Sequence, residues 1–499
     1  MHGGLFVETL PLWINGKPYT PQSAEYVDVV NPATGELIAR QVDANESDIS
    51  AAVSAAQRAL DSWASKLPGE RARILFACAS ALRDNIEDLA RIESVNTGRP
   101  IREMRAQMRR VPEFFEYYAG VALTLAGGDS LVVPGTFQGG YQRIPLGVVG
   151  LLAPFNHPLM ITAKKLSAAL SAGNTAILKP SEYTPLSAFR LAELFQQAGL
   201  PSGALNVVTG QGSTTGKLLV GHRAIRKIDV TGSEATGRAI AQQAGYNLKR
   251  VTCELGGKGA AIFFDDCNLD DAVSNALYAV FIGSGQTCIQ AARLLVQRSL
   301  YPAFVNQFAN RVRALRVGDP MNPTTQLGPV ISERQRQRIL GMISEAVQSG
   351  ARLIAGGKSI QGQGFFLEPT VFVDVDPGSR LGQEEVFGPV VSIMPFDDWT
   401  DAVKIANDTR YGLGMSVWTS DLKRALQTRD ALDCGIVWVN DHHRTEPSLP
   451  WNGFKASGLG TECGIDGYLS YTLTQTTILN YSGERFGWFD STDQPLRLN

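Results

Sequence analysis

Three side chains have the types and settings that nucleophilic chemistry requires. Cys288 ends the segment Gly285-Gln-Thr-Cys288, a glycine-containing polar turn whose backbone amides can stabilise a thiolate. Glu254 begins Glu254-Leu-Gly-Gly-Lys258, where a carboxylate with a pKa raised by burial can act as a general base. Asn156, in Phe155-Asn156-His157-Pro158, can donate to a developing oxyanion. Taken singly, each also has a structural explanation: an inert buried thiol, a surface acid before a turn and a helix N-cap.

Two other segments have residues that suit phosphate and ribose groups. Thr231-Gly-Ser233 opens a predicted helix, and Gly with Ser at a helix N-terminus suits a phosphate. Its spacing is not GxGxxG, so the standard dinucleotide fingerprint is absent. Lys179 and Glu182 bracket Pro180, where an acid after the first crossover can hold ribose hydroxyls or simply form a solvated ion pair.

A parallel sheet is predicted to position these residues. From residue 147, apolar β runs alternate with helical stretches, which is typical of a parallel sheet with crossover helices. Ligands of such sheets bind at the carboxyl ends of the strands, and each run here ends in small, polar or charged residues. The predicted strands are 148–153, 175–178, 204–208, 227–230 and 250–253, and their polar ends are 154–156, 179–182, 210–212, 231–233 and 254–258.

The remaining chain predicts helices first and a second α/β unit later. The first 125 residues indicate a short strand at 12–14, a turn at Asn15-Gly16, and helices that begin with Ser47 as an N-cap and continue at 71–95 and 101–122. A hairpin follows, with strands at 130–133 and 141–144. The second unit has predicted strands at 260–264, 294–296, 370–373, 390–394, 416–418 and 436–439.

Composition narrows the function classes. The chain has 499 residues, of which 44% are hydrophobic and 19% charged, so it can bury two or three cores. Lys plus Arg (46) nearly balances Asp plus Glu (48), which disfavours nucleic acid as a partner. The start lacks a secretory pattern, and the longest apolar stretches are too short to span a membrane. Six cysteines without a CxxC pair and five histidines without HExxH predict no metal site and a cytoplasmic protein with reduced thiols.

Together and in this order, the segments resemble the aldehyde dehydrogenase superfamily, in its NAD(P)-dependent, hydrolytic branch. The resemblance runs from about Trp13 to Thr476, and 34 positions lead from Glu254 to Cys288, as in that family. The segments that carry it are Pro154-Phe-Asn156, Ile177-Leu-Lys-Pro-Ser-Glu182, Val230-Thr-Gly-Ser233, Glu254-Leu-Gly-Gly-Lys258, Gly285-Gln-Thr-Cys288, Glu385-Val-Phe-Gly-Pro389 and Pro450-Trp-Asn-Gly-Phe-Lys455.

The resemblance implies an α/β fold in three parts. Residues 1–122 and 146–255 would form a Rossmann-like parallel-sheet domain that binds NAD, and residues 256–472 a second α/β domain for catalysis. Residues 123–145 and 473–499 would form a β-ribbon oligomerisation arm and a tail. A homodimer or homotetramer with a small-molecule aldehyde substrate is therefore expected.

The resemblance also implies catalytic roles. Cys288 would attack the aldehyde to give a thiohemiacetal, with Asn156 and the Cys288 backbone N–H as the oxyanion hole. After hydride transfer to NAD, Glu254 would activate the water that hydrolyses the thioester. Lys165 and Glu462 match a proposed proton relay.

The implied cofactor residues follow the predicted sheet edge. Lys179 and Glu182 would bind the adenosine ribose, Ser233 the pyrophosphate, Glu385 the nicotinamide ribose, and Phe387 would flank the nicotinamide ring. Because the Glu182 carboxylate would repel a 2′-phosphate, NAD is expected over NADP. The other implied cofactor positions are Phe155, Gly212, Gly216, Thr231, Gly232 and Leu255.

The implied substrate tunnel departs from the family pattern. Lys164 stands where Trp is frequent, Pro450-Trp-Asn-Gly453 replaces Pro-Phe-Gly-Gly, and Thr461 replaces an Arg. The implied tunnel residues are His157, Lys164, Ile282, Thr287, Ile289, His443, Thr445 and Trp451.

Two substrate classes remain open from the sequence. The favoured interpretation is an aromatic or other hydrophobic aldehyde packed on Trp451 and Ile289, with the charged side chains in water at the tunnel mouth. The alternative is a semialdehyde with an anionic tail held by Lys164 or Arg444. A CoA-acylating enzyme is less favoured because Glu254 is present, and a non-catalytic binding protein because Cys288 is also present.

Overall fold

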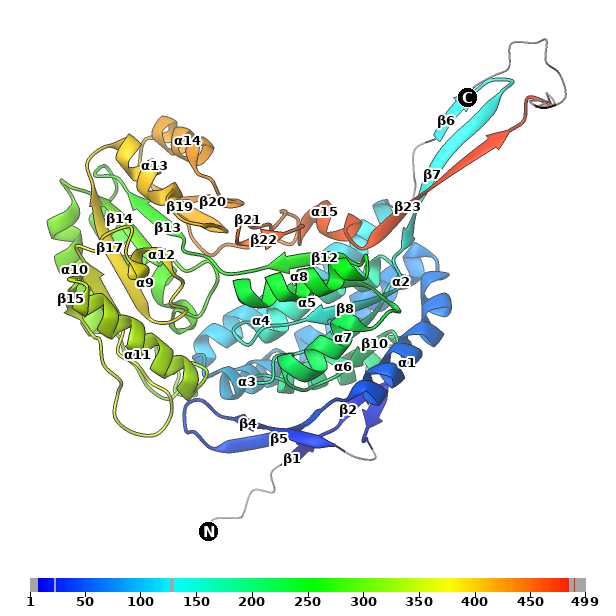
Figure 1. Cartoon of the computed structure of the whole chain (residues 1–499), viewed down its shortest axis with the longest axis horizontal. Helices are drawn as coiled ribbons and strands as arrows, with labels where there is room; N and C mark the ends of the chain where they lie inside the picture. Colours follow the sequence, from blue (N-terminus) through cyan, green and yellow to red (C-terminus); the bar gives the residue numbers. More distant parts are fainter. Residues whose placement is uncertain (1–7, 22–23, 126–129, 484–488, 490–499) are drawn as a thin grey trace.

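The computed structural model describes residues 8–21, 24–125, 130–483 and 489. Two large sheets, each flanked by helices, make up the body of the molecule, and a narrow three-stranded arm extends away from it (Figure 1). This architecture confirms the predicted α/β fold class. Most of the predicted tail, from residue 484 onward, lies outside the described residues.

The first sheet has eight strands in the order β22-β12-β11-β8-β9-β10-β2-β3. Its five central strands are parallel and are the five predicted between residues 147 and 254, while β2, β3 and β22 pair antiparallel at the edges. The strands are β2 (Leu12–Ile14), β3 (Lys17–Tyr19), β8 (Val148–Leu152), β9 (Thr175–Lys179), β10 (Leu205–Val207), β11 (Ile225–Thr231), β12 (Arg250–Glu254) and β22 (Gly458–Leu459).

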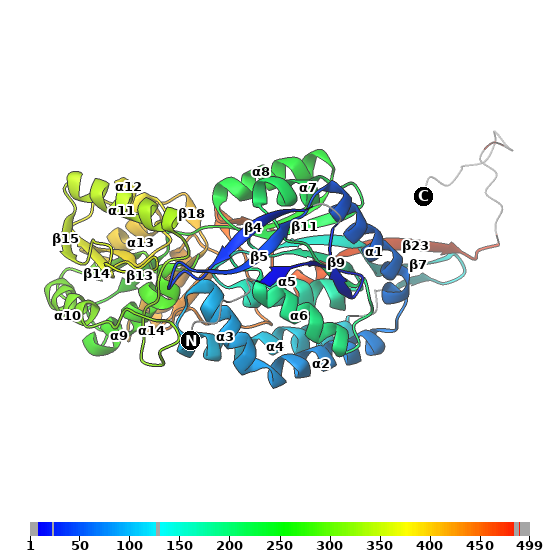
Figure 2. The ribbon, with the colours of Figure 1, turned by 90° about the horizontal axis from the view of Figure 1, so that it is seen from below.

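Helices bury both faces of this sheet (Figure 2). Successive side chains of a strand point to opposite faces, so Val149 and Leu151 of β8 join one core while Val148 and Leu152 join the other. This is why the strands are continuous apolar runs. One face packs on α2 (Pro68–Asp84), α4 (Ile101–Thr124), α5 (Pro158–Ser171) and α6 (Leu186–Gln197), and the other on α1 (Glu46–Ala64), α7 (Lys217–Gly221) and α8 (Glu234–Tyr246).

The second sheet has seven strands in the order β15-β16-β17-β14-β13-β19-β20, all parallel except β15. Six of them match the predicted strands. The strands are β13 (Ala260–Phe263), β14 (Arg293–Gln297), β15 (Arg352–Ala355), β16 (Thr370–Val373), β17 (Val390–Phe396), β19 (Gly414–Trp418) and β20 (Ile436–Val439). The helices of this half are α9 (Leu269–Phe281), α10 (Tyr301–Arg313), α11 (Glu333–Gln348), α12 (Arg380–Gln383), α13 (Trp399–Asn407) and α14 (Leu422–Ala431).

The arm consists of β6 (Ser130–Val133), β7 (Phe137–Pro145) and β23 (Thr472–Asn480). β7 lies between the other two and pairs antiparallel with both, so a segment near residue 140 and one near residue 476 form one ribbon (Figure 1). The hairpin turn is shorter than the predicted 134–140, because Thr136 N already bonds to Val133 O and β7 begins at Phe137. Apolar side chains of the arm, including Leu131 and Ile478, are exposed.

A small sheet near the N-terminus was not predicted. β1 (Glu8–Leu10), β5 (Leu37–Asp43) and β4 (Glu25–Val30) form it, where the sequence had indicated a single short strand before the helices. β4 is mostly exposed, so the apolar run that identified the other strands is absent from it. The predicted strand at 12–14 and the turn at Asn15-Gly16 are confirmed, with positive φ at both turn residues.

Two helix predictions need correction. α1 begins at Glu46, and its N-cap is Asn45 and not Ser47. The Asn45 side chain accepts from the backbone N–H groups of Ser47 and Asp48, and the Asp48 carboxylate accepts from the Asn45 backbone N–H, which completes a capping box. The stretch 71–95 is two helices, α2 and α3 (Ile86–Thr97), separated at Asn85. Within the described residues, no helix has both the length and the apolar character that crossing a membrane requires.

Candidate active site

The site forms where the carboxyl end of the first sheet meets a loop of the second. Glu254 is the last residue of β12, and Asn156 lies between β8 and α5. Cys288 follows α9, in the loop that leads to β14. A Cβ on Gly257 would lie 2.4 Å from the carbonyl oxygen of Cys288, so the glycines after Glu254 allow the two backbones to touch.

The turn before Cys288 has an unusual backbone. Gly283, Ser284 and Gly285 all have positive φ, and a Cβ on Gly285 would lie 2.1 Å from the carbonyl oxygen of Gly388. The Ser284 hydroxyl donates to the carbonyl of Gly328 at 2.9 Å, which holds the one non-glycine residue of the turn in this conformation. Such a strained, buried turn points the side chain that follows it in a fixed direction.

Asn156 is held against this loop. Its Nδ2 donates to the Gln286 carbonyl at 2.8 Å, and one of its two amide hydrogens is left for a ligand. The helix-cap explanation is wrong, because α5 begins at Pro158 with His157 at the N-cap position and no side-chain cap. Asn156 is therefore available as an oxyanion donor.

The Cys288 thiol is protonated in the free chain. Burial raises its pKa to about 12, and the nearby Lys164 charge only partly opposes this shift. The expectation that the turn alone stabilises a thiolate is therefore not met, and a base must remove the proton. Cys253, by contrast, lies in the core of the first sheet.

Glu254 is placed to be that base. The residue is only 3% exposed, and neither carboxylate oxygen has a hydrogen-bond partner among the described residues. Burial, and secondly the Glu462 charge, raise its pKa well above the ordinary value, with Lys165 and Lys164 opposing. A carboxyl group with a raised pKa can take up and release a proton near neutral pH.

Lys165 lies in a fully buried ionic cluster that the sequence showed only in part. Its ammonium contacts both Asp229 and Glu462, and the Tyr471 hydroxyl donates to Asp229 at 2.6 Å. Burial alone would raise the pKa of Asp229, but the Lys165 and Lys227 charges and these hydrogen bonds hold it below the ordinary value. The sequence analysis did not identify Asp229 as part of the site. A charged residue within an otherwise apolar, buried strand is the pattern that could have identified it.

The expected cofactor residues come from both halves of the molecule. Ser233 caps α8, because its Oγ accepts from Thr236 N. Lys179 Nζ lies 3.8 Å from Glu182 Oε2. From the second half, the Glu385 carboxylate accepts from Gly257 N at 2.9 Å. The other expected residues are Phe155 and Phe387, whose rings meet edge to face at 5.6 Å, Gly212 and Gly216 just before α7, Thr231 as the last residue of β11, Gly232 after it, and Leu255 after β12.

The expected tunnel residues divide into an apolar wall and polar groups. Ile289 and Trp451 are buried in one cluster with Trp438. Lys164 is only 7% exposed, and its Nζ lies 3.8 Å from the centre of the Trp451 ring. Arg444 is exposed and paired with Asp441. The favoured interpretation placed these charged side chains in water, and this is correct for the exposed Arg444 and wrong for the buried Lys164. The remaining members are Thr287, which is buried, and His157, Ile282, His443 and Thr445, which are partly buried.

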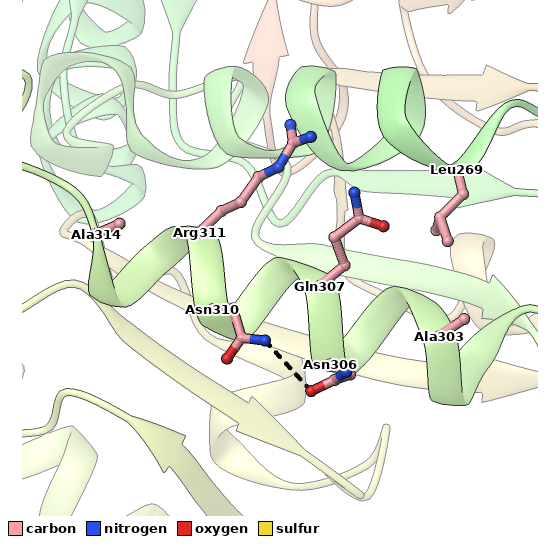
Figure 3. A pocket seen from close by; sticks show the side chains of 7 residues that line it. All are labelled: Leu269, Ala303, Asn306, Gln307, Asn310, Arg311 and Ala314. Carbon is pink, nitrogen blue, oxygen red and sulfur yellow. Dashed lines mark hydrogen bonds between the residues drawn. The ribbon is translucent and has the colours of Figure 1, made fainter.

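A separate surface hollow carries no such chemistry. It has a volume of about 550 Å³ and lies along α10 (Figure 3). Its lining residues are Leu269, Ala303, Asn306, Gln307, Asn310, Arg311 and Ala314. The described part of the chain also has no group of three or more His, Cys, Asp or Glu residues arranged to hold a metal.

Comparisons with known proteins agree over nearly the whole chain. The model of the "Aldehyde dehydrogenase family" matches residues 19–477. The betaine aldehyde dehydrogenase of Vibrio vulnificus strain YJ016 is 40% identical over 491 residues, which cover 97% of this chain and 99% of the relative. The phenylacetaldehyde dehydrogenase of Pseudomonas fluorescens is 40% identical over 480 residues, covering 94% and 95%. The solved structure of PnpE, from Pseudomonas sp. WBC-3, in complex with nicotinamide adenine dinucleotide has a TM-score of 0.94 and 40% identity, covering 96% of this chain and 99% of that chain.

The ionic cluster predicts a stability difference for Asp229→Asn. Because the folded pKa of Asp229 lies below its ordinary 3.8, the ionised form stabilises the fold fully above that pH and loses this effect as pH falls through the folded value. Asp229→Asn should cost on the order of 3 kcal/mol at pH ~7, measured by denaturant unfolding, and the difference should shrink only below about pH 4. The exposed Asp61→Asn is the control. Equal stability of Asp229→Asn and wild type at pH ~7 would mean that Asp229 is not ionised there.

Proposed function

Because the chain belongs to the aldehyde dehydrogenase family, we propose that it oxidises an aldehyde to a carboxylic acid with NAD, through a covalent intermediate on Cys288. The observation that carries the proposal is the meeting of Cys288, Glu254 and Asn156 at the junction of the two sheets. A thiol, an unpartnered carboxylate and a free amide hydrogen are the groups that this chemistry needs.

The first half-reaction forms a thioester. Glu254 takes the Cys288 proton, and the thiolate adds to the aldehyde carbon. The resulting alkoxide is stabilised by the free Asn156 N–H and the Cys288 backbone N–H; one such donor contributes about 3–4 kcal/mol. Bound NAD would supply the acceptor for the hydride that leaves this carbon.

The second half-reaction hydrolyses the thioester. The ionised Glu254 carboxylate takes a proton from water, and the hydroxide adds to the thioester carbonyl, releasing the carboxylic acid and the Cys288 sulfur. Lys165 and Glu462 lie close enough to affect the Glu254 charge and would relay its proton away from the site. The presence of Glu254 therefore supports hydrolysis rather than acyl transfer to CoA.

The chain's own residues fit a dinucleotide. Thr231 has a buried hydroxyl oxygen without a hydrogen-bond partner in the described residues, and Gly232 beside it leaves space that a Cβ would partly fill. Ser233 follows at the N-terminus of α8, which suits a pyrophosphate. Lys179 and Glu182 would bind the adenosine ribose, and Glu385 would bind the nicotinamide ribose next to the Phe155 and Phe387 rings.

The substrate carbon skeleton is proposed to be aromatic or otherwise hydrophobic. Ile289 and Trp451 form the apolar side of the expected tunnel, which supports an aromatic or other hydrophobic substrate. The phenylacetaldehyde dehydrogenase relative is named for a substrate of this kind. Betaine aldehyde, for which other relatives are named, carries a quaternary ammonium. The Lys164 ammonium already occupies the face of Trp451 and would repel that cation.

We also propose a separate role for each of the three parts of the chain. Residues 1–122 and 146–255 bind the cofactor, and residues 256–472 supply Cys288, although β22 within that span pairs with the first sheet. The arm, 123–145 and 473–499, joins copies of the chain into a homodimer or homotetramer. Its free strand edges and exposed apolar side chains would favour aggregation if nothing covered them.

Rapid mixing tests the two half-reactions separately. Wild type should release NADH on mixing with phenylacetaldehyde and continue to turn over. Cys288→Ser should lose activity by roughly 10³-fold or more, because its hydroxyl is a far weaker nucleophile. Glu254→Gln should slow the NADH burst and lose steady turnover, because the same base serves deprotonation of Cys288 and hydrolysis of the thioester. A fully active Cys288→Ser enzyme would exclude the proposed covalent route.

Cofactor preference follows from Glu182. Its carboxylate would accept from a 2′-hydroxyl and repel a 2′-phosphate, so kcat/KM should be at least roughly tenfold higher with NAD than with NADP. Glu182→Gln should narrow that ratio, mainly by improving NADP. Glu193→Gln, an exposed change on α6, is the control and should leave the ratio unchanged. A higher kcat/KM with NADP in wild type would contradict this role.

Assembly through the arm is measurable by light scattering. The full chain should have two or four times the 53.9 kDa mass of one copy. Ile478→Asp, which places a charge on the exposed face of β23, should shift the mass toward one copy, whereas the surface change Asp61→Asn should not. A wild-type mass of a single chain at micromolar concentration would rule out the proposed assembly.

A further inference from the structure

Lys164 has a buried charge without an acidic partner. Its ammonium lies on the Trp451 ring, and it forms no ion pair or hydrogen bond with any of the described residues. The neighbouring Lys165, on the next position of the same helix, contacts two carboxylates. A buried cation needs a compensating group, and the aromatic ring supplies only part of it.

The nearest acidic groups do not neutralise Lys164. The charges of Lys164, Glu254 and Glu462 influence one another, so these side chains lie near the same space. Glu462 is already engaged by Lys165. Glu254 forms no ion pair with Lys164, and neither of its carboxylate oxygens has a hydrogen-bond partner among the described residues. An anion that enters the tunnel would therefore find an uncompensated positive charge.

His157 supplies a hydrogen-bond donor beside Lys164. Arg99 Nη1 lies 2.6 Å from His157 Nδ1, and because a guanidinium has no lone pair to offer, Nδ1 must accept. Gln107 Nε2 lies 2.6 Å from the same Nδ1, whose single lone pair the two donors share, and Gln107 Oε1 accepts from Arg99 at 3.2 Å. The single proton of the neutral ring must therefore be on Nε2.

The charge state of His157 agrees with this tautomer. Burial, and secondly the Arg99 charge, lower its pKa well below the ordinary value, so the ring is neutral at physiological pH. His157 is the N-cap residue of α5, and Lys164 lies seven positions later, about two turns along the same face of that helix. No acceptor for the Nε2 proton is found among the residues that the structure describes.

Three other polar groups near the expected tunnel are already engaged. The ring of His443 donates from Nε2 to the Ala279 carbonyl at 3.1 Å. The Thr445 carbonyl accepts from Arg110 at 2.8 Å, and Arg444 is exposed and paired with Asp441. Besides the Thr287 and Thr445 hydroxyls, Lys164 and His157 supply two donors that have no acceptor among the described residues, one charged and one neutral.

We propose that the substrate is an aldehyde that carries a carboxylate, with the carboxylate bound by Lys164 Nζ and His157 Nε2–H and the carbon skeleton packed on Trp451 and Ile289. This inference rests on the proposed function and narrows its substrate class from hydrophobic aldehydes to oxo acids. Arg99 is a positioning residue in this scheme, because it acts on the substrate only through the tautomer of His157.

Matched substrates test the proposal. The ratio of kcat/KM for 4-formylbenzoate to that for methyl 4-formylbenzoate isolates the carboxylate, because the ring and the aldehyde are the same. Wild type should prefer 4-formylbenzoate, and Lys164→Gln should lower the ratio by about tenfold or more, the range for a charged hydrogen bond. Lys164→Arg should keep most of the preference, and the exposed Lys423→Gln should keep all of it.

Two kinetic outcomes would overturn the proposal. An unchanged ratio in Lys164→Gln would show that Lys164 does not contact the carboxylate. An equal loss for both substrates would show that Lys164 acts on the Cys288 thiolate instead, a role that its effect on the Cys288 charge also permits.

Alkylation separates this proposal from the proposed function, since it needs no turnover. Iodoacetate carries a carboxylate and iodoacetamide does not, and both react with a cysteine sulfur. The rate of Cys288 modification, followed by peptide mass spectrometry, should favour iodoacetate in wild type relative to Lys164→Gln by roughly tenfold. The same iodoacetate-to-iodoacetamide ratio in both proteins would overturn the carboxylate site, whereas absence of aldehyde oxidation alone would overturn only the proposed function.

Discussion

Close backbone contact between glycines holds the site together. Gly257 passes so near to Cys288 that a single added methyl group would meet its carbonyl oxygen, and Gly285 does the same against Gly388. The first contact brings the end of the first sheet against a loop of the second, so the carboxylate and the thiol come from different halves of the molecule, and the second contact is within the second half. The high glycine content of the chain, 50 of 499 residues, is thus partly a requirement of the site.

Buried charge is organised around two consecutive lysines of α5. Lys165 is compensated by Asp229 and Glu462, which keeps it protonated and makes the cluster rigid. Lys164 faces Trp451 with no carboxylate partner among the described residues. Two neighbours on one helix therefore serve different ends, because successive residues of a helix point about 100° apart. Lys165 is held by two carboxylates, and the Lys164 ammonium lies on the Trp451 ring.

A second network, of hydrogen bonds and one ion pair, connects Asn156 to the turn before Cys288. Arg99 donates to the Asn156 carbonyl and pairs with Glu103, and Glu103 in turn accepts from Gly283 N in the turn before Cys288. Arg99 and Glu103, just before and within the first turn of helix α4, thereby connect the Asn156 segment to the turn before Cys288. Precise separation of a nucleophile and its oxyanion donor is a main source of catalytic rate, and buried groups with satisfied hydrogen bonds provide it.

The sequence by itself determined the two α/β units and the order of their parallel strands along the chain, because apolar runs buried on both faces are local patterns. It did not determine the N-terminal sheet, where β4 is exposed, or the break between α2 and α3. Only the tertiary structure decided that Lys164 is buried while Arg444 is exposed, that Asp229 joins Lys165, and that the Cys288 pKa is raised. These properties depend on desolvation and on partners distant in the chain, and neither is encoded in the local pattern of any one segment.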